Sequence, residues 1–420
     1  MTKRVIIVGA GLLGLTTAYF LRRHGAEVVV VERRTGAGEE TSFANGSMLH
    51  ASQANPWNEP GILWRALAML GREEAALLVR LRALPSLIAW GTAFVRASAP
   101  ARYLQNFEKN ARLAAYSLAQ MAELRGACAL EYDFQSRGTL KLFRTPAAVE
   151  GALRLCAQLA EWGIAYEVID APRAVILEPA LAPIQDQLAG GLFFPHDEAG
   201  DAWKFCVGLA AQLRRDQVEF RFETNAQRLS RRAPHLLIHT ARGIAAADAI
   251  VLAAGSYTPS LARTVGLHVP VAPVKGYSLT LPLNGWQAGP QVPVIDDHLH
   301  AAVCPLGGRL RIAGTAEFAG FDLALTPSRI ENLFGLVTAL YPAFVPHLER
   351  ATARAWTGLR PMSSDGVGIM GATPVPGVFL NTGHGPLGWT MAAGAGRLVA
   401  DQIMGVPTAL PLAPYAHARF

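Results

Sequence analysis

A glycine-rich turn near the amino terminus constrains the fold of this chain more than any other segment. Gly9, Gly11 and Gly14 lie between an apolar run typical of a buried strand, residues 5–8, and a stretch with helical periodicity, residues 12–24. A second strand-like run, residues 27–32, ends in Glu32. Strand, turn, helix and strand in this order predict a β-α-β unit with parallel strands. We therefore expect a Rossmann-type sheet.

The three glycines of this G-x-G-x-x-G pattern suit the binding of a dinucleotide. The first permits the tight turn, the second lets the backbone approach a pyrophosphate, and the third lets helix and strand pack closely. The helix amino terminus stabilises the anion, and Glu32 accepts hydrogen bonds from ribose hydroxyls while its charge repels a 2′-phosphate. NADP is thereby disfavoured. The pattern alone does not choose between NAD and FAD, because both bind to it.

The overall composition limits the remaining classes of protein. The 420 residues are 51% hydrophobic, and the net charge of +6 is spread along the chain, so nucleic acid is not an expected partner. The amino terminus carries no signal region, and no apolar run reaches the roughly 20 residues that span a bilayer. Cys128, Cys156, Cys206 and Cys304 lack metal-ligand spacing, so we expect packed thiols and no metal site. These features predict a cytoplasmic protein.

Helical and strand-like segments alternate along the rest of the chain and predict two interleaved domains. The apolar run 249–254 adds a buried strand to the first domain, and the tail beyond residue 378 returns to it. A helical pattern at 58–124 is broken by Pro85 and Pro100. The strands of a second, antiparallel sheet are expected at 269–281, 301–303 and 310–313. The other expected elements are strands at 138–143, 165–169, 218–222 and 378–380 and helices at 147–162, 202–213 and 390–404.

Segments distributed along the whole chain match the pattern of one family. The most specific is N-T-G-H-G-P-L-G-W-T-M at 381–391. The others are E-T-S-F-A-N-G at 40–46, N-P-W at 55–57, G-T-L at 138–140, P-H-D-E-A-G-D at 195–201, A-G-S-Y at 254–257, V-K-G-Y-S-L-T at 274–280, W-T-G-L-R-P-M at 356–362 and D-G at 365–366. Together they resemble the D-amino acid dehydrogenase family, which belongs with glycine oxidase, sarcosine oxidase and D-amino acid oxidase to one superfamily of FAD enzymes.

The resemblance implies an α/β fold in which a Rossmann-type FAD domain carries an inserted α+β substrate domain built on a largely antiparallel sheet. The FAD domain is expected at 1–85, 195–268 and 350–420, and the substrate domain at 86–194 and 269–349. We expect FAD to be bound without a covalent link, because no cysteine lies near residues 360–370. The residues expected to hold FAD are Gly9, Gly11, Leu12, Leu13, Gly14, Glu32, Arg33, Ser42, Asn45, Gly46, Ser47, Gly255, Gly383, His384, Gly385, Leu387, Gly388 and Thr390.

Three further residues are candidates for contact with the substrate. At the position of Arg360 the superfamily places the arginine that pairs with the substrate carboxylate, and a planar guanidinium suits this task because it forms two charge-assisted hydrogen bonds. A second candidate is Tyr277, which either donates to the carboxylate or is a packed strand residue. His50 either approaches the reactive face or is structural.

The resemblance implies oxidative deamination of a D-amino acid, in which the Cα hydride passes to flavin N5 and water then gives the 2-oxo acid and ammonia. It also points to a quinone or another respiratory acceptor, and Arg311 stands where oxidases of the superfamily can carry a lysine. The alternatives are a cyclic or N-methyl amino acid substrate such as D-hydroxyproline, D-proline or sarcosine, a flavin subunit of a larger complex, and a non-catalytic NAD-binding protein. Residues 61–103, rich in Leu, Ala, Trp and Arg, are a candidate for peripheral membrane contact.

Overall fold

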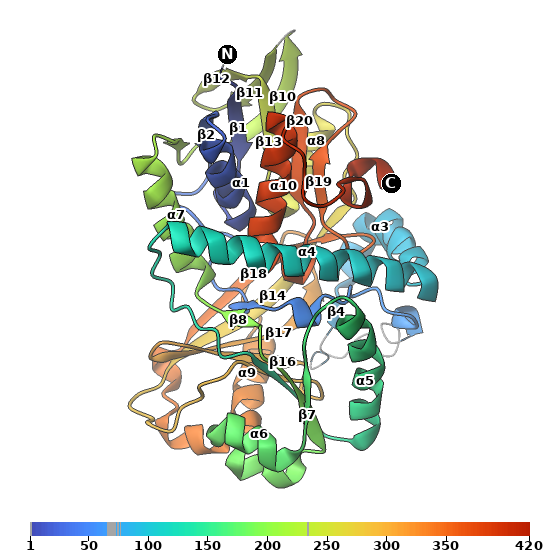
Figure 1. Cartoon of the computed structure of the whole chain (residues 1–420), viewed down its shortest axis with the longest axis vertical. Helices are drawn as coiled ribbons and strands as arrows, with labels where there is room; N and C mark the ends of the chain where they lie inside the picture. Colours follow the sequence, from blue (N-terminus) through green and yellow to red (C-terminus); the bar gives the residue numbers. More distant parts are fainter. Residues whose placement is uncertain (1, 65–72, 74, 76, 233–234) are drawn as a thin grey trace.

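A six-stranded sheet forms the upper half of the molecule in Figure 1, a computed structural model that describes residues 2–64, 73, 75, 77–232 and 235–420. Its strand order is β19-β20-β13-β1-β2-β9, and all neighbours are parallel except β19 and β20. The predicted β-α-β unit is confirmed. The strands are β1 (Arg4–Val8), β2 (Glu27–Val31), β9 (Glu219–Arg221), β13 (Ala249–Leu252), β19 (Ile369–Ala372) and β20 (Val378–Thr382).

Both faces of this sheet are covered, which explains why its central strands β1, β2 and β13 are largely apolar. Val5 and Ile7 pack into the cluster on the helical face, whereas Ile6 and Val8 point to the opposite face. The helical face carries α1 (Leu12–Arg23), α7 (Ala202–Arg215) and α10 (Ala392–Met404). The opposite face carries α8 (Thr258–Arg263) and a small antiparallel sheet of β10 (Ala226–Arg232), β11 (His235–Thr240) and β12 (Gly243–Ala247).

Helix α10 fits between two other helices because it is built from small residues. A Cβ on Gly396 would lie 2.8 Å from the backbone of α1 at Thr17, and one on Gly394 would lie 2.8 Å from Cα of Ser117. Ser117 belongs to α4 (Pro100–Ala127), the long helix that crosses the molecule between its two halves in Figure 1. Because these backbones approach closely, α4 is held against the helices that pack on the six-stranded sheet.

A nine-stranded, largely antiparallel sheet forms the other half. Eight strands follow the order β18-β14-β17-β16-β15-β5-β7-β6, and β4 pairs with β17. Among the described strands of this sheet, the pairs of β15 with β5 and of β17 with β4 are parallel and the others are antiparallel. The strands are β4 (Leu77–Val79), β5 (Thr139–Phe143), β6 (Glu167–Ile169), β7 (Gly190–Phe194), β14 (Val271–Pro282), β15 (Val294–Asp296), β16 (Ala301–Leu306), β17 (Arg309–Phe318) and β18 (Arg354–Ser363).

The remaining helices surround this second sheet. The helical pattern is interrupted at Pro85 and Pro100, as predicted, because each proline lies in the first turn of a new helix, α3 or α4, where the ring replaces an amide that has no helical partner. Part of the helical pattern at 58–124, residues 65–72, 74 and 76, lies outside the described residues. The elements still to be named are α3 (Leu84–Ala97), α5 (Pro146–Glu161), α6 (Ala171–Leu177), α9 (Pro327–Leu340) and the short pair β3 (Met48–Leu49) and β8 (Glu198–Ala199).

Three segments lie on the other side of the domain boundaries expected from the sequence. Strand β18, expected in the FAD domain, pairs with β14 along ten residues, from Val271 with Ser363 to Thr280 with Arg354. Strand β4 also joins the second sheet, through β17. Helix α4, expected in the substrate domain, packs on α10. In each case a contact between residues far apart in sequence decides the placement, and the local pattern does not contain it.

Candidate active site

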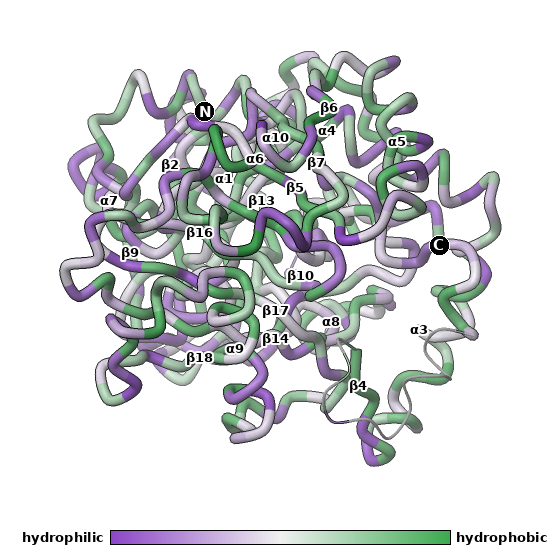
Figure 2. Tube along the Cα trace, turned by 90° about the horizontal axis from the view of Figure 1, so that it is seen from below, coloured by the Kyte–Doolittle hydropathy of each residue, from purple (hydrophilic) through white to green (hydrophobic). Residues whose placement is uncertain are grey.

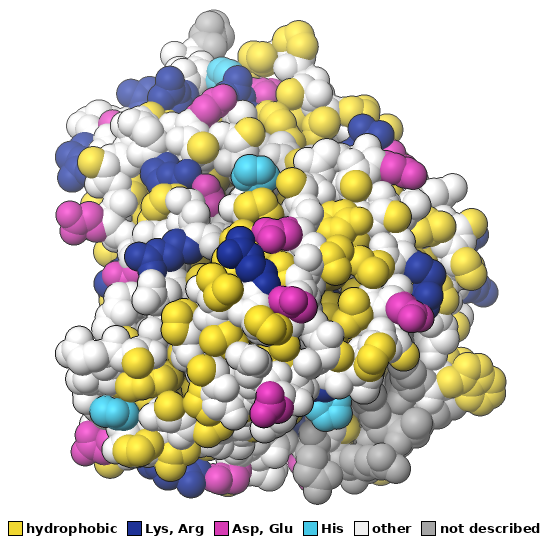
Figure 3. Space-filling view, turned by 60° about the horizontal axis from the view of Figure 1, so that its bottom comes forward, with side chains coloured by type: hydrophobic (Ala, Val, Ile, Leu, Met, Phe, Trp, Pro, Cys, Tyr) yellow, Lys and Arg dark blue, Asp and Glu magenta, His cyan; other side chains and the backbone are white. Residues whose placement is uncertain are grey.

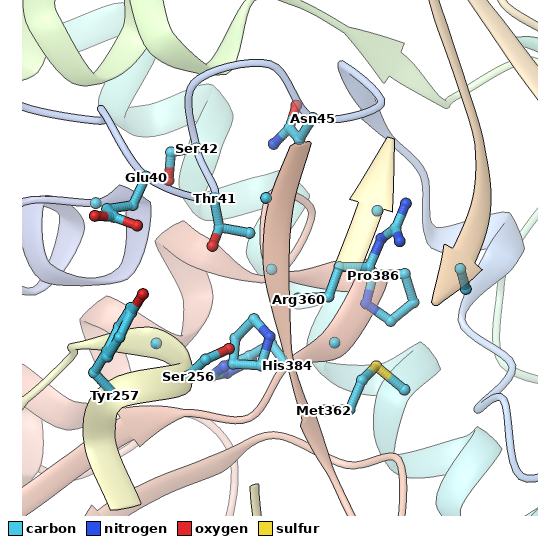
Figure 4. A pocket seen from close by; sticks show the side chains of 18 of the residues that line it. Glu40, Thr41, Ser42, Asn45, Ser256, Tyr257, Arg360, Met362, His384 and Pro386 are labelled. Carbon is cyan, nitrogen blue, oxygen red and sulfur yellow. The ribbon is translucent and has the colours of Figure 1, made fainter. Parts of the chain in front are cut away.

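A cavity of about 1450 Å³ lies between the carboxyl ends of the parallel strands and the face of the second sheet. Figure 4 shows Glu40 and Tyr257 at one end, Arg360 and Met362 at the other, and His384 between them. The cavity brings together most of the residues predicted from the sequence. Those that border it are Gly9, Gly11, Leu12, Leu13, Glu32, Arg33, Ser42, Asn45, Gly46, Ser47, His50, Gly255, Tyr277, Arg360, His384, Gly385 and Gly388.

The glycine turn at the end of β1 has the shape that a pyrophosphate requires. Gly9 has φ +112°, and a Cβ there would lie 2.6 Å from the carbonyl oxygen of Ala253. A Cβ on Gly14 would lie 1.9 Å from the carbonyl oxygen of Gly9, so Gly14 serves packing and does not border the cavity. Gly11 differs, because its Cβ would meet only Ser42 Oγ, at 3.3 Å. The need for glycine at position 11 is therefore set by what enters the cavity.

Glu32 is held in place at the end of β2. Its Oε2 accepts a hydrogen bond from the backbone N–H of Ala10 and its Oε1 from that of Arg34, both at 2.8 Å. Burial raises the pKa of Glu32, while these two hydrogen bonds act in the opposite direction. A carboxylate offers further lone pairs, so ribose hydroxyls can still bind. Beside it, the Arg33 guanidinium lies 3.7 Å from the centre of the Tyr257 ring.

The loop 42–47 is fixed by the second sheet. Ser278 Oγ donates to the carbonyl oxygen of Ala44 at 2.6 Å, and Arg311 Nη1 donates to that of Asn45 at 3.1 Å. Ser47 adopts a left-handed conformation, φ 62°, and its N–H donates to Asn45 Oδ1. Arg311 itself is 4% exposed and does not border the cavity, so its role is to hold this loop in position.

The carboxy-terminal glycine loop forms the opposite wall. His384 borders the cavity, and burial lowers the pKa of its imidazole to about 3, so the ring is neutral. A Cβ on Gly368 would lie 2.6 Å from this ring, which shows why that position is glycine. Gly383, Leu387 and Thr390 do not border the cavity. Leu387 packs in the core, and Thr390 Oγ1 accepts a hydrogen bond from the backbone N–H of His50 at 3.0 Å.

Strand β18 presents alternate residues to the cavity, as a strand must. Trp356, Gly358, Arg360 and Met362 border it in alternation, and Pro361 between the last two also borders it. Among the described residues Arg360 has no acidic partner; it donates only to the carbonyl oxygen of Thr315 at 3.4 Å and lies 5.6 Å from the Trp57 ring centre. Burial lowers the pKa of Arg360 to about 10, so it stays protonated at neutral pH. An unpaired buried cation in a cavity is a site for an anion.

A glycine on the neighbouring strand β14, two residues along from the register partner of Arg360, makes room for its guanidinium. A Cβ on Gly276 of β14 would lie 2.2 Å from Arg360 Nη1 and 2.4 Å from its Cζ. The guanidinium therefore lies directly over the backbone of β14. Thr315, whose carbonyl oxygen accepts the hydrogen bond from Arg360, lies in a β-bulge. It is the extra residue of this bulge on β17 and has φ 59°, a strained value for a β-branched residue.

The two other candidates for contact with the substrate, Tyr277 and His50, differ in whether their polar atoms already have hydrogen-bond partners. Tyr277 donates its hydroxyl to Glu317 at 2.5 Å, and that hydroxyl also lies 3.0 Å from Thr326 Oγ1, so the structure does not support donation to a substrate carboxylate. Although Tyr277 borders the cavity, its side chain packs in a core cluster, as strand period predicts for a residue between Gly276 and Ser278. His50 borders the cavity with a neutral imidazole, since burial lowers its pKa to about 4, and its Nδ1 has no hydrogen-bond partner among the described residues.

Several bordering residues were not predicted as site residues. They include Thr41 and Glu40, Ser256 and Tyr257, Thr315, and an apolar group contributed by α3, β4 and β17. The matching segments at 40–46 and 254–257 contained a signal for the first four. The contribution of α3 carries no local signal, because it depends on how that helix packs. The four cysteines are buried and free, as expected.

A Rossmann-type sheet whose glycine turn and ribose-binding glutamate border a long cavity defines a dinucleotide-binding protein. The family model described as "DAO: FAD dependent oxidoreductase" matches residues 4–402. The chain belongs to this family of FAD-dependent oxidoreductases, and FAD is its cofactor. The residues present fit that group, since the glycine turn and Glu32 border a cavity large enough to continue past the dinucleotide to Arg360.

Similar proteins agree with this placement. The chain is 41% identical to a D-amino acid dehydrogenase of Cereibacter sphaeroides (strain ATCC 17029), over 96% of this chain and 92% of the relative. It is 41% identical to a D-amino acid dehydrogenase of Paramagnetospirillum magneticum, over 99% of both. Glycine oxidase from Geobacillus kaustophilus shares the fold with TM-score 0.79 at 24% identity, over 100% of both chains. L-proline dehydrogenase from P. horikoshii also has TM-score 0.79, at 18% identity, over 100% of this chain and 98% of that one.

Proposed function

We propose that the protein oxidises a D-amino acid to the imino acid, which water converts to the 2-oxo acid and ammonia. The observation that carries the proposal is Arg360, a protonated guanidinium without an acidic partner among the described residues, at the end of the cavity opposite Glu40. The names of the relatives supply the substrate class, and the arginine supplies a reason why an α-carboxylate binds at this place.

The residues around Arg360 also bear on the amino group. The acidic residues that border the cavity, within the described part of the chain, are Glu32 and Glu40, and Figure 4 places Glu40 far from Arg360. An ammonium group beside Arg360 would thus meet a positive charge and no carboxylate, which favours the neutral amine. FAD, when bound there without a covalent link, accepts the two electrons that the Cα–N unit loses. The neutral imidazoles of His50 and His384 can take up the released proton or bind water.

We propose further that a quinone takes the electrons from the reduced enzyme. Two electrons and two protons convert the quinone to a quinol, which balances the oxidation of the amino acid. The supporting observation is Arg311, which stands where a lysine would be expected in an oxidase and which donates hydrogen bonds to Thr280 and Asn45.

On the face drawn in Figure 3, basic and acidic side chains are interspersed, and nucleic acid would find no continuous basic surface there.

A substrate screen with the purified full-length protein tests both proposals. We expect D-amino acids to bleach the flavin bands anaerobically, their L-isomers to bleach them far more slowly, and a short-chain quinone to restore the bands. D-proline, D-hydroxyproline and sarcosine belong in the same screen, because they decide between a primary and a secondary amine. Absence of bleaching by every amine would contradict the proposed function. Rapid peroxide formation in air, with no reaction toward quinone, would contradict the acceptor alone.

We also propose peripheral contact with an anionic membrane near the start of α3. Among the described residues no helix is long and apolar enough to cross a bilayer. Leu81 and Ile88 are 76% and 69% exposed, which suits shallow insertion. Of the arginines expected to meet lipid head groups, Arg80 and Arg82 already pair with acidic residues, Arg96 is exposed, and Arg65 and Arg72 lie outside the described residues.

Vesicle flotation at low salt measures this contact. The protein should float with vesicles that contain anionic phospholipid and remain behind with purely zwitterionic ones. Replacing Leu81, which does not border the cavity, by serine should reduce flotation and leave solution activity toward a soluble acceptor in place. Equal recovery of the wild-type protein from both kinds of vesicle would rule out an electrostatic contact.

A further inference from the structure

The cavity continues past Arg360 into a space with apolar walls, which we call the apolar annex. Its walls come from α3, from β4 and β17 of the second sheet, and from the loop at Trp57. Figure 2 shows α3 as a predominantly hydrophobic helix at the edge of the molecule, with β4 beside it. Six residues define the annex: Trp57, Leu77, Leu87, Trp90, Phe94 and Phe318.

The annex is a built structure and not a loose gap. Trp90 Nε1 donates a hydrogen bond to the carbonyl oxygen of Met362 at 3.0 Å, which fixes α3 to β18 two residues beyond Arg360. The Trp90 ring stacks on Phe94 with 4.8 Å between ring centres and lies 5.5 Å from Phe318. These contacts hold the aromatic walls in a defined position relative to the guanidinium.

The annex begins where the carboxylate of the substrate is expected. Arg360 and Met362 point into the cavity from the same strand, and Figure 4 shows both at its far end from Glu40 and Tyr257. The Trp57 ring borders both Arg360 and the annex, with 5.6 Å between the ring centre and Cζ. An amino acid whose carboxylate is bound by Arg360 therefore has its other substituents within reach of these walls.

The charge distribution decides which substituent fits. In the described part of the chain, the Asp, Glu, Lys and Arg residues that border the cavity are Glu32, Arg33, Glu40 and Arg360. The first three lie at the end near the glycine turn, and Arg360 is already paired with the substrate carboxylate, so a charged group in the annex would lose water and find no further partner of opposite sign. An apolar or aromatic group would instead leave water for walls that it can contact closely.

We propose that the annex holds the side chain of the amino acid, so that the enzyme selects substrates with a large apolar or aromatic side chain over small or charged ones. This inference rests on the proposed function and specifies its substrate class. Recognition is divided: Arg360 binds the group that all amino acids share, and the annex distinguishes among their side chains.

Gly91 offers a direct way to fill the annex. It lies on α3 between Leu87 and Val95, borders the cavity, and a Cβ there would have nothing within 4 Å. A larger side chain therefore enters open space, and losing a glycine inside a helix does not weaken the helix. Gly335 of α9 is a matched control, because its Cβ also has nothing within 4 Å and it does not border the cavity.

The experiment compares kcat/KM for D-phenylalanine, D-alanine and D-lysine in the wild-type protein, Gly91→Phe and Gly335→Phe. We expect the wild type to prefer D-phenylalanine to the other two by about 10-fold or more, since single methylene differences alone are worth roughly 10-fold in a hydrophobic pocket. Gly91→Phe should lower the value for D-phenylalanine by about 100-fold and that for D-alanine by less than about 3-fold. Gly335→Phe should match the wild type.

Other outcomes overturn the inference in distinguishable ways. A wild type that prefers D-alanine or D-lysine, or a Gly91→Phe variant that loses activity equally toward D-phenylalanine and D-alanine, removes the side chain from the annex while leaving amino acid oxidation in place. If no amino acid reduces the flavin of the wild type, the proposed function fails and the inference fails with it. The flavin spectrum of each variant shows whether FAD is still bound.

Discussion

Replacing Arg360 by leucine is expected to lower kcat/KM for the amino acid substrate by about 100-fold or more, mainly through a higher KM. Removing one partner of a buried, hydrogen-bonded charge pair costs roughly 3 kcal/mol, which corresponds to that factor. The effect should be large because no other cation borders this end of the cavity among the described residues. FAD should remain bound, since its cradle at residues 9–32 lies at the opposite end.

Two further variants make this result specific. Arg360→Lys should recover only part of the loss, because an ammonium group is a point charge and does not form the paired hydrogen bonds of a guanidinium. Arg350→Leu is the matched control, since Arg350 is an exposed residue paired with Glu331 on the surface. Steady-state kinetics together with the flavin spectrum provide the measurement. An Arg360→Leu enzyme with unchanged KM would remove this residue from the substrate site.

The cofactor half of the fold was predictable because its signals are local. The runs at β1 and β2 are apolar since both faces of the sheet are covered, and Gly14 has no alternative when a Cβ would lie 1.9 Å from a carbonyl oxygen. Such constraints act within a few residues and can be read from the sequence. The resemblance of the 381–391 segment added the glycine loop with His384, which borders the cavity as expected.

The parts that were missed depend on contacts between distant residues. Strand β10 of the small sheet is largely exposed and carries Arg228 and Arg231, so its sequence lacks the apolar pattern of a strand. Whether β18 belongs to the first or second sheet is decided by its pairing with β14, about 80 residues earlier in the chain. The orientation of Tyr277, by contrast, follows from strand period once Gly276 is known to face Arg360.

The residues of the apolar annex likewise could not be predicted as site residues from the sequence. Trp57 and Trp90 are ordinary packing residues by their sequence context, and only the position of α3 over β17 and β18 makes them walls of a cavity. The sequence therefore indicates the cofactor and the arginine that we propose for the substrate carboxylate, whereas the proposed selection of the side chain depends on tertiary packing. The signals for the cofactor and the reaction lie in short sequence segments, whereas the annex depends on packing between distant segments. The resemblance therefore indicated the reaction but not the preferred side chain.

Replacing Gly276 by alanine should lower kcat/KM by about 100-fold without a matching loss of stability. The new Cβ would lie 2.2 Å from Arg360 Nη1, and the end of a flexible side chain can move aside more easily than backbone. The guanidinium would shift by about 1 Å, and a misplacement of that size can cost about 100-fold in rate. The fold should persist, because Gly276 does not have a positive φ and alanine suits a strand at least as well as glycine.

A double-mutant cycle separates this mechanism from a general disturbance of the sheet. In an Arg360→Leu background the Gly276→Ala change should have little further effect on kcat/KM, because the group that it displaces is already absent. Gly308→Ala provides the control, since Gly308 lies in the turn between β16 and β17 of the same sheet and its Cβ would have nothing within 4 Å. Additive losses in the double variant would mean that Gly276 acts on the substrate or on FAD and not through Arg360. A 2-oxo acid or other carboxylate inhibitor should show the same non-additivity in its Kd, which links the position of the guanidinium to binding rather than to the chemical step.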